Sequence, residues 1–154
     1  MLPAPRIPYL SDVGLLVGRV ALGVIFIAHG WQKLNETGHA GVAKGFEAMD
    51  IPLPGLAAHY AIWVELVGGI ALVIGLLVPV AALLLLLDML GAFWFVHMDK
   101  GLFVDKGGYE FVLILAATAF LLLCVGGGRI GLDGALFSRG EASRERSGRD
   151  HAHA

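Results

Sequence analysis

The sequence is poor in charge and in cysteine. Of its 154 residues 16% are charged and 57% are hydrophobic, whereas ordinary soluble domains carry about 25% charged residues. The single cysteine, Cys124, excludes an internal disulfide, a CxxC redox pair and a cysteine-rich zinc site. A formal net charge of -2 leaves no basic field for binding nucleic acid. These absences disfavour an ordinary soluble enzyme and favour a small membrane protein of one domain.

Long apolar runs are what the sequence has instead. A transmembrane helix needs about 20 mostly apolar residues, and we predict spans at residues 13–34, 56–78, 80–98 and 109–125. The runs are apolar on every side, as is typical of helices surrounded by lipid. Pro79 separates the second and third spans in a tight hairpin, because proline disfavours helix at its own position and just before it. The predicted fold is an all-α, integral membrane four-helix bundle.

The charged residues outside the spans predict an orientation. An even number of spans places both termini on one side, which holds six arginines, against four lysines at the other side. Because cationic loops favour the cytoplasm, we predict a multi-pass protein of the cell membrane with both termini cytoplasmic. Residues 1–12 form a cytoplasmic N-terminal segment, and residues 13–137 form the membrane domain. Residues 138–154, polar and rich in arginine, form a disordered cytoplasmic tail.

Ionisable side chains inside the spans are the second unusual feature. Each costs at least about 2.5–3.5 kcal/mol on insertion scales, so it faces the bundle interior, finds a partner or lies near an interface. Taken singly, such residues near span ends also have a structural explanation, because they reach the interface by snorkelling. Together they predict a polar membrane cluster toward the outer end of the bundle. Its members are His29, Lys33, His59, Glu65, His97 and Glu110.

Two further charges lie deeper in the predicted spans. Arg19 lies in the inner half of the first span. Its depth is close to that of Asp88 when depth is counted along each helix at a rise of about 1.5 Å per residue. We predict a buried ion pair between Arg19 and Asp88, with Arg19 and Glu65 as the alternative pair. Such a pair neutralises both groups, or it fixes the register of the helices. No metal site is predicted, since His151 and His153 are interpreted as part of a solvated tail.

The order and spacing of these residues resemble the DoxX family of small four-span membrane proteins. The matching elements are Arg19-x3-Gly23, His29-Gly30-x2-Lys33, Glu65-x2-Gly68-Gly69, His97 and the closing Gly126-Gly-Gly-Arg129-Ile-Gly-Leu132-Asp133. They cover about residues 10–135. Gly131 stands where the family's closing motif usually has serine, and Asp88 is unusual for the family. The resemblance implies a four-helix membrane bundle and a loose link to redox chemistry, because the family's name derives from a subunit of a thiosulfate:quinone oxidoreductase.

The first functional hypothesis is an accessory or quinone-linked redox subunit of a membrane oxidoreductase system. His29 and Lys33 would donate hydrogen bonds to the quinone carbonyls, and Glu65 and Glu110 would exchange protons. A redox partner protein would supply the electrons, because the chain has no CxxC pair, Rossmann pattern or iron–sulfur spacing. Haem held between His59 and His97 is the less favoured cofactor.

Two alternatives belong to other classes. The polar groups would line the path of a small transporter or channel component, with a homo-oligomer built on Gly14-x3-Gly18 supplying the room. In a non-catalytic membrane adaptor the charged residues would only hold register, while the tail binds anionic headgroups or a cytoplasmic partner. All three functions place the chain in a lipid bilayer without nucleic acid, and the sequence leaves open whether it is an enzyme.

Overall fold

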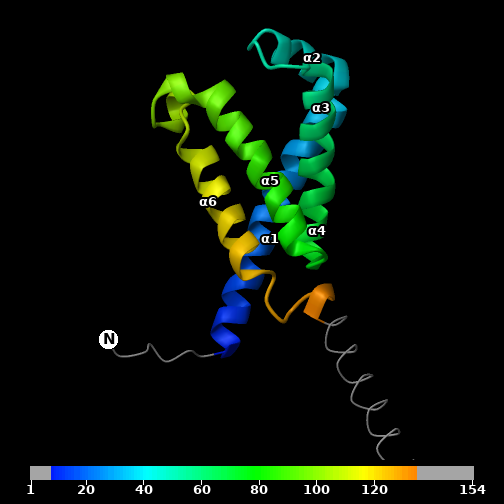
Figure 1. Cartoon of the computed structure of the whole chain (residues 1–154), viewed down its shortest axis with the longest axis vertical. Helices are drawn as coiled ribbons and strands as arrows, with labels where there is room; N and C mark the ends of the chain where they lie inside the picture. The colour runs from blue at the N-terminus through cyan, green and yellow to red at the C-terminus, as the bar shows by residue number, and fades with distance from the viewer. Residues whose placement is uncertain (1–7, 135–154) are drawn as a thin grey trace, which may run out of the picture.

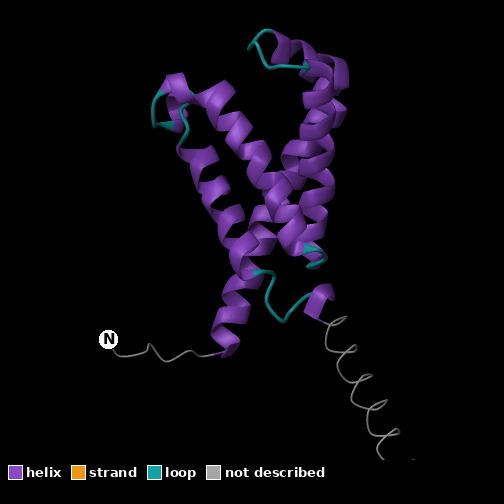
Figure 2. Cartoon of the chain, in the orientation of Figure 1, coloured by secondary structure: helices purple, strands orange, loops and turns teal. Residues whose placement is uncertain are grey.

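The computed structural model describes residues 8–134, and every regular element among them is a helix (Figures 1 and 2). The prediction of an all-α membrane bundle is therefore confirmed. The predicted tail at residues 138–154, with its two histidines, and the first seven residues lie outside the described part of the chain. The two ends of the described part lie at the same end of the bundle (Figure 1). We call this the terminal end, and the opposite one the α2 end.

The first helix is longer than predicted and is followed by a helix that was not predicted. Helix α1 spans Pro8–Gln32 and continues through a π-helical turn, η1, at Lys33–Thr37. Helix α2 follows at Gly38–Glu47, inside the segment predicted to be a loop, and packs against α3 (Figure 1). The positive φ of 71° at Gly38, which glycine adopts without strain, marks the junction between η1 and α2.

The remaining helices follow the predicted order. Helices α3 (Pro54–Trp63) and α4 (Gly69–Ile74) are joined by a second π-helical turn, η2 (Val64–Gly68). Helix α5 (Val78–Ala92) continues through a third, η3 (Phe93–His97), and the short 3-10 turn η4 (Met98–Lys100). The 3-10 turn η5 (Val104–Lys106) precedes α6 (Glu110–Val125).

Three of these helical segments are long and apolar enough to cross a membrane, namely Tyr9–Glu47, Pro54–Ile74 and Val78–Lys100. The chain is therefore a multi-pass membrane protein in contact with lipid. Helix α6 is equally apolar but has 16 residues, which is just below the usual range of about 17–25. The fourth crossing, predicted at residues 109–125, coincides with α6 and stays a prediction.

A carboxylate near the end of the described chain holds the hairpin between α4 and α5. The Asp133 carboxylate accepts hydrogen bonds from the backbone N–H groups of Leu77 (2.9 Å) and Val78 (3.1 Å). It thus caps α5 at its N-terminus, where unpaired N–H groups and the helix dipole favour an anion. Leu77 itself adopts a left-handed φ of 49°, and Pro79 lies in the first turn of α5. The predicted hairpin is therefore closed by a residue more than 50 positions away.

Arg19 is buried at the same end of the bundle, with 2% of its surface exposed. Its guanidinium donates hydrogen bonds to the carbonyl oxygens of Gly127 (3.2 Å) and Ile130 (2.6 Å). The carboxylate that attracts it electrostatically is that of Asp133. A Cβ atom on Gly75 or on Gly131 would collide with this guanidinium, so glycine is required on both sides of it.

The predicted Arg19–Asp88 ion pair is wrong, and so is its alternative with Glu65. Arg19 lies level with the turn at Gly75, whereas Asp88 lies ten residues into α5, about 15 Å from the start of that helix. The depth was misjudged because the predicted spans were taken to begin at one level, whereas α1, which begins at Pro8, extends beyond the other helices at the terminal end (Figure 1). The charge of Arg19 is met by carbonyl groups and Asp133 instead.

Glycines allow α1 to cross the second helical segment at close range. A Cβ atom on Gly23 would lie 2.6 Å from the carbonyl oxygen of Gly69, and one on Gly30 would lie 2.7 Å from the backbone nitrogen of Leu66. Small residues at such crossings are a typical means of helix packing in lipid. A Cβ atom on Gly14 or Gly18 would meet nothing within 4 Å. Self-association through that pair stays a prediction.

We expect Gly23→Val to destabilise the bundle, because the new side chain meets backbone atoms of α4 that have little freedom to shift. Overpacking of this kind typically costs about 1–3 kcal/mol. Gly18→Val, on the same helix but in open space, is the matched control and should unfold within a few degrees of the wild type. Thermal unfolding in detergent, followed by circular dichroism, measures both. Equal unfolding temperatures for the two variants would contradict the close crossing.

We expect Asp133→Ala to lower stability by about 1–2 kcal/mol, the upper range for losing a helix cap. Asp133→Asn should lie between the alanine variant and the wild type, since the amide oxygen still accepts a hydrogen bond but carries no charge for Arg19. The exposed carboxylate Glu36, replaced by alanine, serves as the control. Chemical unfolding in detergent gives the three free energies, and an alanine variant as stable as the control would show that Asp133 does not hold the hairpin.

Candidate functional site

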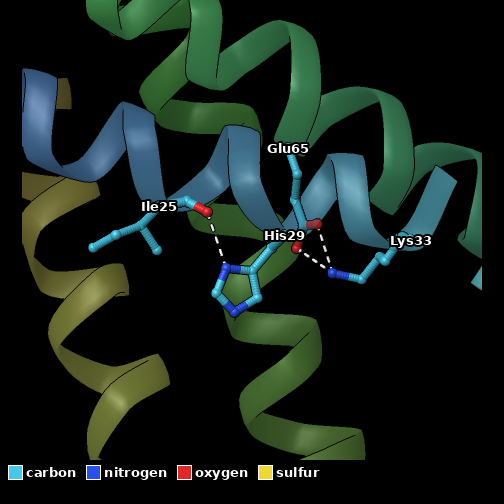
Figure 3. A network of polar contacts seen from close by, with 4 residues as sticks. All are labelled: Ile25, His29, Lys33 and Glu65. Carbon is cyan, nitrogen blue, oxygen red and sulfur yellow. Dashed lines mark hydrogen bonds and ion pairs between the residues drawn. The ribbon is translucent and has the colours of Figure 1, made fainter. Parts of the chain in front are cut away.

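The polar centre of the bundle is an ion pair between Lys33 and Glu65 (Figure 3). The Lys33 Nζ donates to both carboxylate oxygens of Glu65, at 2.7 Å to Oε1 and 2.5 Å to Oε2. The side chain of Glu65 is 4% exposed and that of Lys33 is 25% exposed. Because so little water reaches the pair, each charge depends on the other for its stability.

Three π-helical turns carry the polar residues of this region. Lys33 begins η1, Glu65 lies in η2, and His97 ends η3. Such turns are rare, and they occur frequently at functional sites because they re-aim side chains within a helix. Three helices are thus widened where they contribute an ionisable side chain. Nothing in the apolar pattern of the sequence indicated these turns.

Asp88 joins the Lys33–Glu65 pair from α5. Its charged neighbours are the Glu65 carboxyl and the Lys33 ammonium group, and all three line the same cavity. We call Lys33, Glu65 and Asp88 the carboxyl–lysine triad. Two carboxyl groups and one ammonium group have zero net charge only when one of the carboxyls holds a proton. In a region where net charge is costly, this composition makes the triad a candidate proton-binding group.

A cavity of about 460 Å³ ends at the triad. Apart from the triad and Tyr60, its lining is apolar and comes from the α2–α3 region, α5 and η3, including Phe46, Leu53, Leu56, Leu87 and Phe95. Leu53, Leu56 and Leu87 are at least half exposed, so the cavity opens at a surface that faces lipid. The Tyr60 hydroxyl donates to the carbonyl oxygen of Leu84 at 2.7 Å. The volume lies in the usual range for small-molecule sites.

A second cavity, of about 210 Å³, lies on the other side of the pair. Lys33 and Glu65 line both cavities, as do Met89 and Ala92 of α5. His29, His97 and Phe111 line only the smaller one. The ion pair therefore forms part of the wall between an apolar cavity and one that holds two histidines.

Both histidines of the smaller cavity have one ring nitrogen fixed by the backbone. The Nδ1 of His29 lies 2.9 Å from the carbonyl oxygen of Ile25 (Figure 3), and the Nδ1 of His97 lies 2.6 Å from that of Gly107. A carbonyl oxygen only accepts, so each Nδ1 carries hydrogen and donates. Each Nε2 is then the nitrogen that binds and releases a proton.

The structure divides the six residues of the predicted cluster. His29, Lys33, Glu65 and His97 line the smaller cavity together. His59 instead contacts His39 of α2, with 2.6 Å between His59 Nδ1 and His39 Nε2. Glu110 accepts a hydrogen bond from the backbone N–H of Val104 at 2.6 Å and so holds the loop before α6. Sequence reasoning therefore overestimated the extent of the cluster.

Three residues near these contacts were not assigned to the cluster by the sequence. Asp88 was recognised as a buried charge but was given the wrong partner. Nothing in the sequence pattern marked Tyr60 as a site residue. His39 was missed because it lies in the helix that was not predicted. His59 and His97, considered as axial haem ligands, have separate contacts: His59 lies against His39, and His97 lies against the Gly107 carbonyl. Among residues 8–134, no group of three or more histidine, cysteine or acidic side chains is placed to hold a metal ion.

Known proteins are similar to this chain over most of the bundle. The DoxX family model matches residues 14–98, a range that includes the triad and both histidines of the smaller cavity. The inner membrane protein YqjF of Escherichia coli (strain K12) is 34% identical over 125 residues, which cover 80% of this chain and 92% of YqjF.

Two further relatives are similar over most of their length. A Bacillus subtilis (strain 168) protein named "Putative oxidoreductase CatD" is 30% identical over 126 residues, covering 82% of this chain and 89% of that protein. The inner membrane protein YphA of Escherichia coli (strain K12) is 32% identical over 124 residues, covering 77% of this chain and 87% of YphA. No solved structure matches the chain.

We expect Lys33→Met to destabilise the protein by about 3 kcal/mol, the low end for breaking a buried ion pair, because a quarter of Lys33 is exposed. The double variant Lys33→Met/Glu65→Leu should recover most of that loss, since apolar side chains of similar size replace both charges. Unfolding of the single and double variants in detergent measures the coupling. A double variant less stable than Lys33→Met would contradict the pairing.

Proposed function

The chain belongs to the DoxX family, and from that premise we propose that it is a quinone-linked accessory subunit of a membrane oxidoreductase system. The larger cavity receives the quinone, with the head group at the carboxyl–lysine triad and the apolar tail toward the lipid. The single observation that carries this proposal is the composition of that cavity, whose lining is apolar apart from the triad and Tyr60.

The residues at the polar end suit a quinone carbonyl. The Lys33 ammonium group has three N–H donors and uses two of them on Glu65, so the third is free to donate to a carbonyl oxygen. A carboxyl of the triad that holds a proton is a second donor. The exposed leucines at the mouth of the cavity allow a lipid-soluble molecule to enter from the bilayer without crossing water.

A quinone supplies redox chemistry when it takes two electrons and two protons to become a quinol. The triad is neutral with one proton on Glu65 or Asp88, so these carboxyls would donate the two protons in turn and take up a proton after each transfer. The electrons come from a redox partner protein, since the chain has a single cysteine. The printed name of the Bacillus subtilis relative, "Putative oxidoreductase CatD", supports this class of function.

The proposed orientation places both termini in the cytoplasm. The excess of arginines near the ends of the sequence supports it, and the described chain begins and ends on one side (Figure 1). The triad then lies toward the outer half of the bilayer. A small transporter or channel component and a non-catalytic adaptor are the competing functions, and neither needs a quinone in the larger cavity.

The experiment is a titration of the purified protein, reconstituted in lipid nanodiscs, with decylubiquinone. Binding is followed by quenching of intrinsic tryptophan fluorescence. We expect saturable binding by the wild type and roughly tenfold weaker binding by Gly91→Leu, equivalent to about 1.4 kcal/mol. Gly91 lines the larger cavity, and a Cβ atom there meets nothing within 4 Å, so leucine occupies ligand space without a clash.

Gly18→Leu is the matched control, because it adds the same side chain to open space outside the cavity. It should bind decylubiquinone as the wild type does. Binding that fails to saturate in the wild type, or that is equal in Gly91→Leu and the control, would refute the quinone proposal. Solute flux through proteoliposomes would then test the transporter function. Recovery of bound partner proteins would test the adaptor function.

A further inference from the structure

The two cavities differ in chemistry although they share a wall. The larger one is apolar and opens toward lipid, whereas the smaller one is lined by His29 and His97 as well as by the pair. Its remaining lining comes from Phe26, Met89, Ala92, Phe111, Val112 and Leu115. The titratable side chains that face it are thus those of His29, Lys33, Glu65 and His97, with Asp88 behind the pair.

The smaller cavity has the parts of a proton path. Its volume of about 210 Å³ exceeds that of several water molecules, and its polar groups give such waters partners. Each histidine has Nδ1 held by a carbonyl oxygen, which leaves Nε2 to take up and release a proton. His97, which lines the cavity, is bound to Gly107 in the loop at the α2 end, and His29 is exposed.

We propose that the smaller cavity is a proton-exchange site, in which His29 and His97 carry protons between water at the α2 end and the carboxyl groups of Glu65 and Asp88. In each transfer an imidazolium gives its Nε2 proton to a carboxylate, directly or through a water, and the neutral ring takes a proton from water at the same nitrogen. The triad changes charge by one proton, and the histidine returns to its starting state.

This inference rests on the proposed function, since the protons delivered to Glu65 and Asp88 are the two that the bound quinone requires. The partner redox protein supplies two electrons. The carboxyls of Glu65 and Asp88, which share one proton, supply the two protons in turn, and the histidines restore a proton from water at the α2 end after each transfer. Quinone and water therefore reach the carboxyls from opposite sides of the ion pair. Lys33 holds the Glu65 carboxylate in place between them.

The test measures proton exchange at the carboxyls without any quinone. The purified protein in nanodiscs is mixed rapidly with heavy water, and infrared spectroscopy follows the shift of the carbonyl band of a protonated carboxyl group. Asp88→Asn and Glu65→Gln assign the band. We expect His29→Gln/His97→Gln to slow the exchange by roughly 100-fold, the low end of the contribution of general acid–base groups.

His59→Gln is the matched control, because His59 contacts His39 and lines neither cavity. It should exchange as fast as the wild type. A merely structural role for the two histidines is tested with His29→Gly alone, since the hydrogen bond of His29 lies within its own helix and its ring contacts Phe111 of α6. Added imidazole should restore fast exchange in that variant, and imidazole does not repair a packing defect.

The outcomes separate this inference from the quinone proposal. Two results would overturn the proton-exchange site: equally fast exchange in the wild type and the double glutamine variant, or no protonated carboxyl band in the wild type. Neither result affects the binding of decylubiquinone, so the quinone proposal would stand. Slowed exchange with imidazole rescue supports the site even if decylubiquinone does not bind. In that case the quinone proposal alone fails.

Discussion

A charge inside a bilayer has to be neutralised by the protein, because lipid offers neither water nor counterions. The bundle meets this constraint at two depths and with different chemistry. At the terminal end the Arg19 guanidinium is held by two carbonyl oxygens and the nearby Asp133 carboxylate. Farther along, the Lys33 ammonium group is held by Glu65, with Asp88 beside them. The first arrangement joins the end of the described chain to α1. The second joins η1 to η2, and its two side chains line both cavities.

The apolar parts of the fold serve these two arrangements. Gly23 and Gly69 bring α1 within backbone contact of α4, which fixes the height of Lys33 relative to Glu65. Lys33, Glu65 and His97 lie within the three π-helical turns, and all three line the smaller cavity. Most other large side chains lie outward toward lipid, where an apolar surface carries no cost. Stability and polar chemistry thus depend on the same few close contacts.

The sequence predicted the helical class, the hairpin at Pro79 and the approach of His29, Lys33, Glu65 and His97. These follow from hydropathy and helical periodicity, which are properties of one segment at a time. The Arg19–Asp88 pair failed because depth was counted from the end of each span, whereas α1 extends beyond the other helices and so places Arg19 level with the turn before α5. The separation of His59 and Glu110 depended on α2 and on the loop before α6, whose paths no apolar pattern records. Asp88 lies beside the Lys33–Glu65 pair because of how α5 packs, which a single sequence does not encode locally.

The contacts of Arg19 also bear on how the protein is made. Arg19 leaves the ribosome early, but its carbonyl partners lie 108 and 111 residues later in the chain, and the hairpin cap at Asp133 emerges later still. Until that final stretch is synthesised, the first helix enters the membrane with a guanidinium whose native acceptors do not yet exist. The bundle therefore reaches its native arrangement only after Asp133 has been synthesised, and a chain that stops before Gly127 leaves the Arg19 guanidinium without these acceptors.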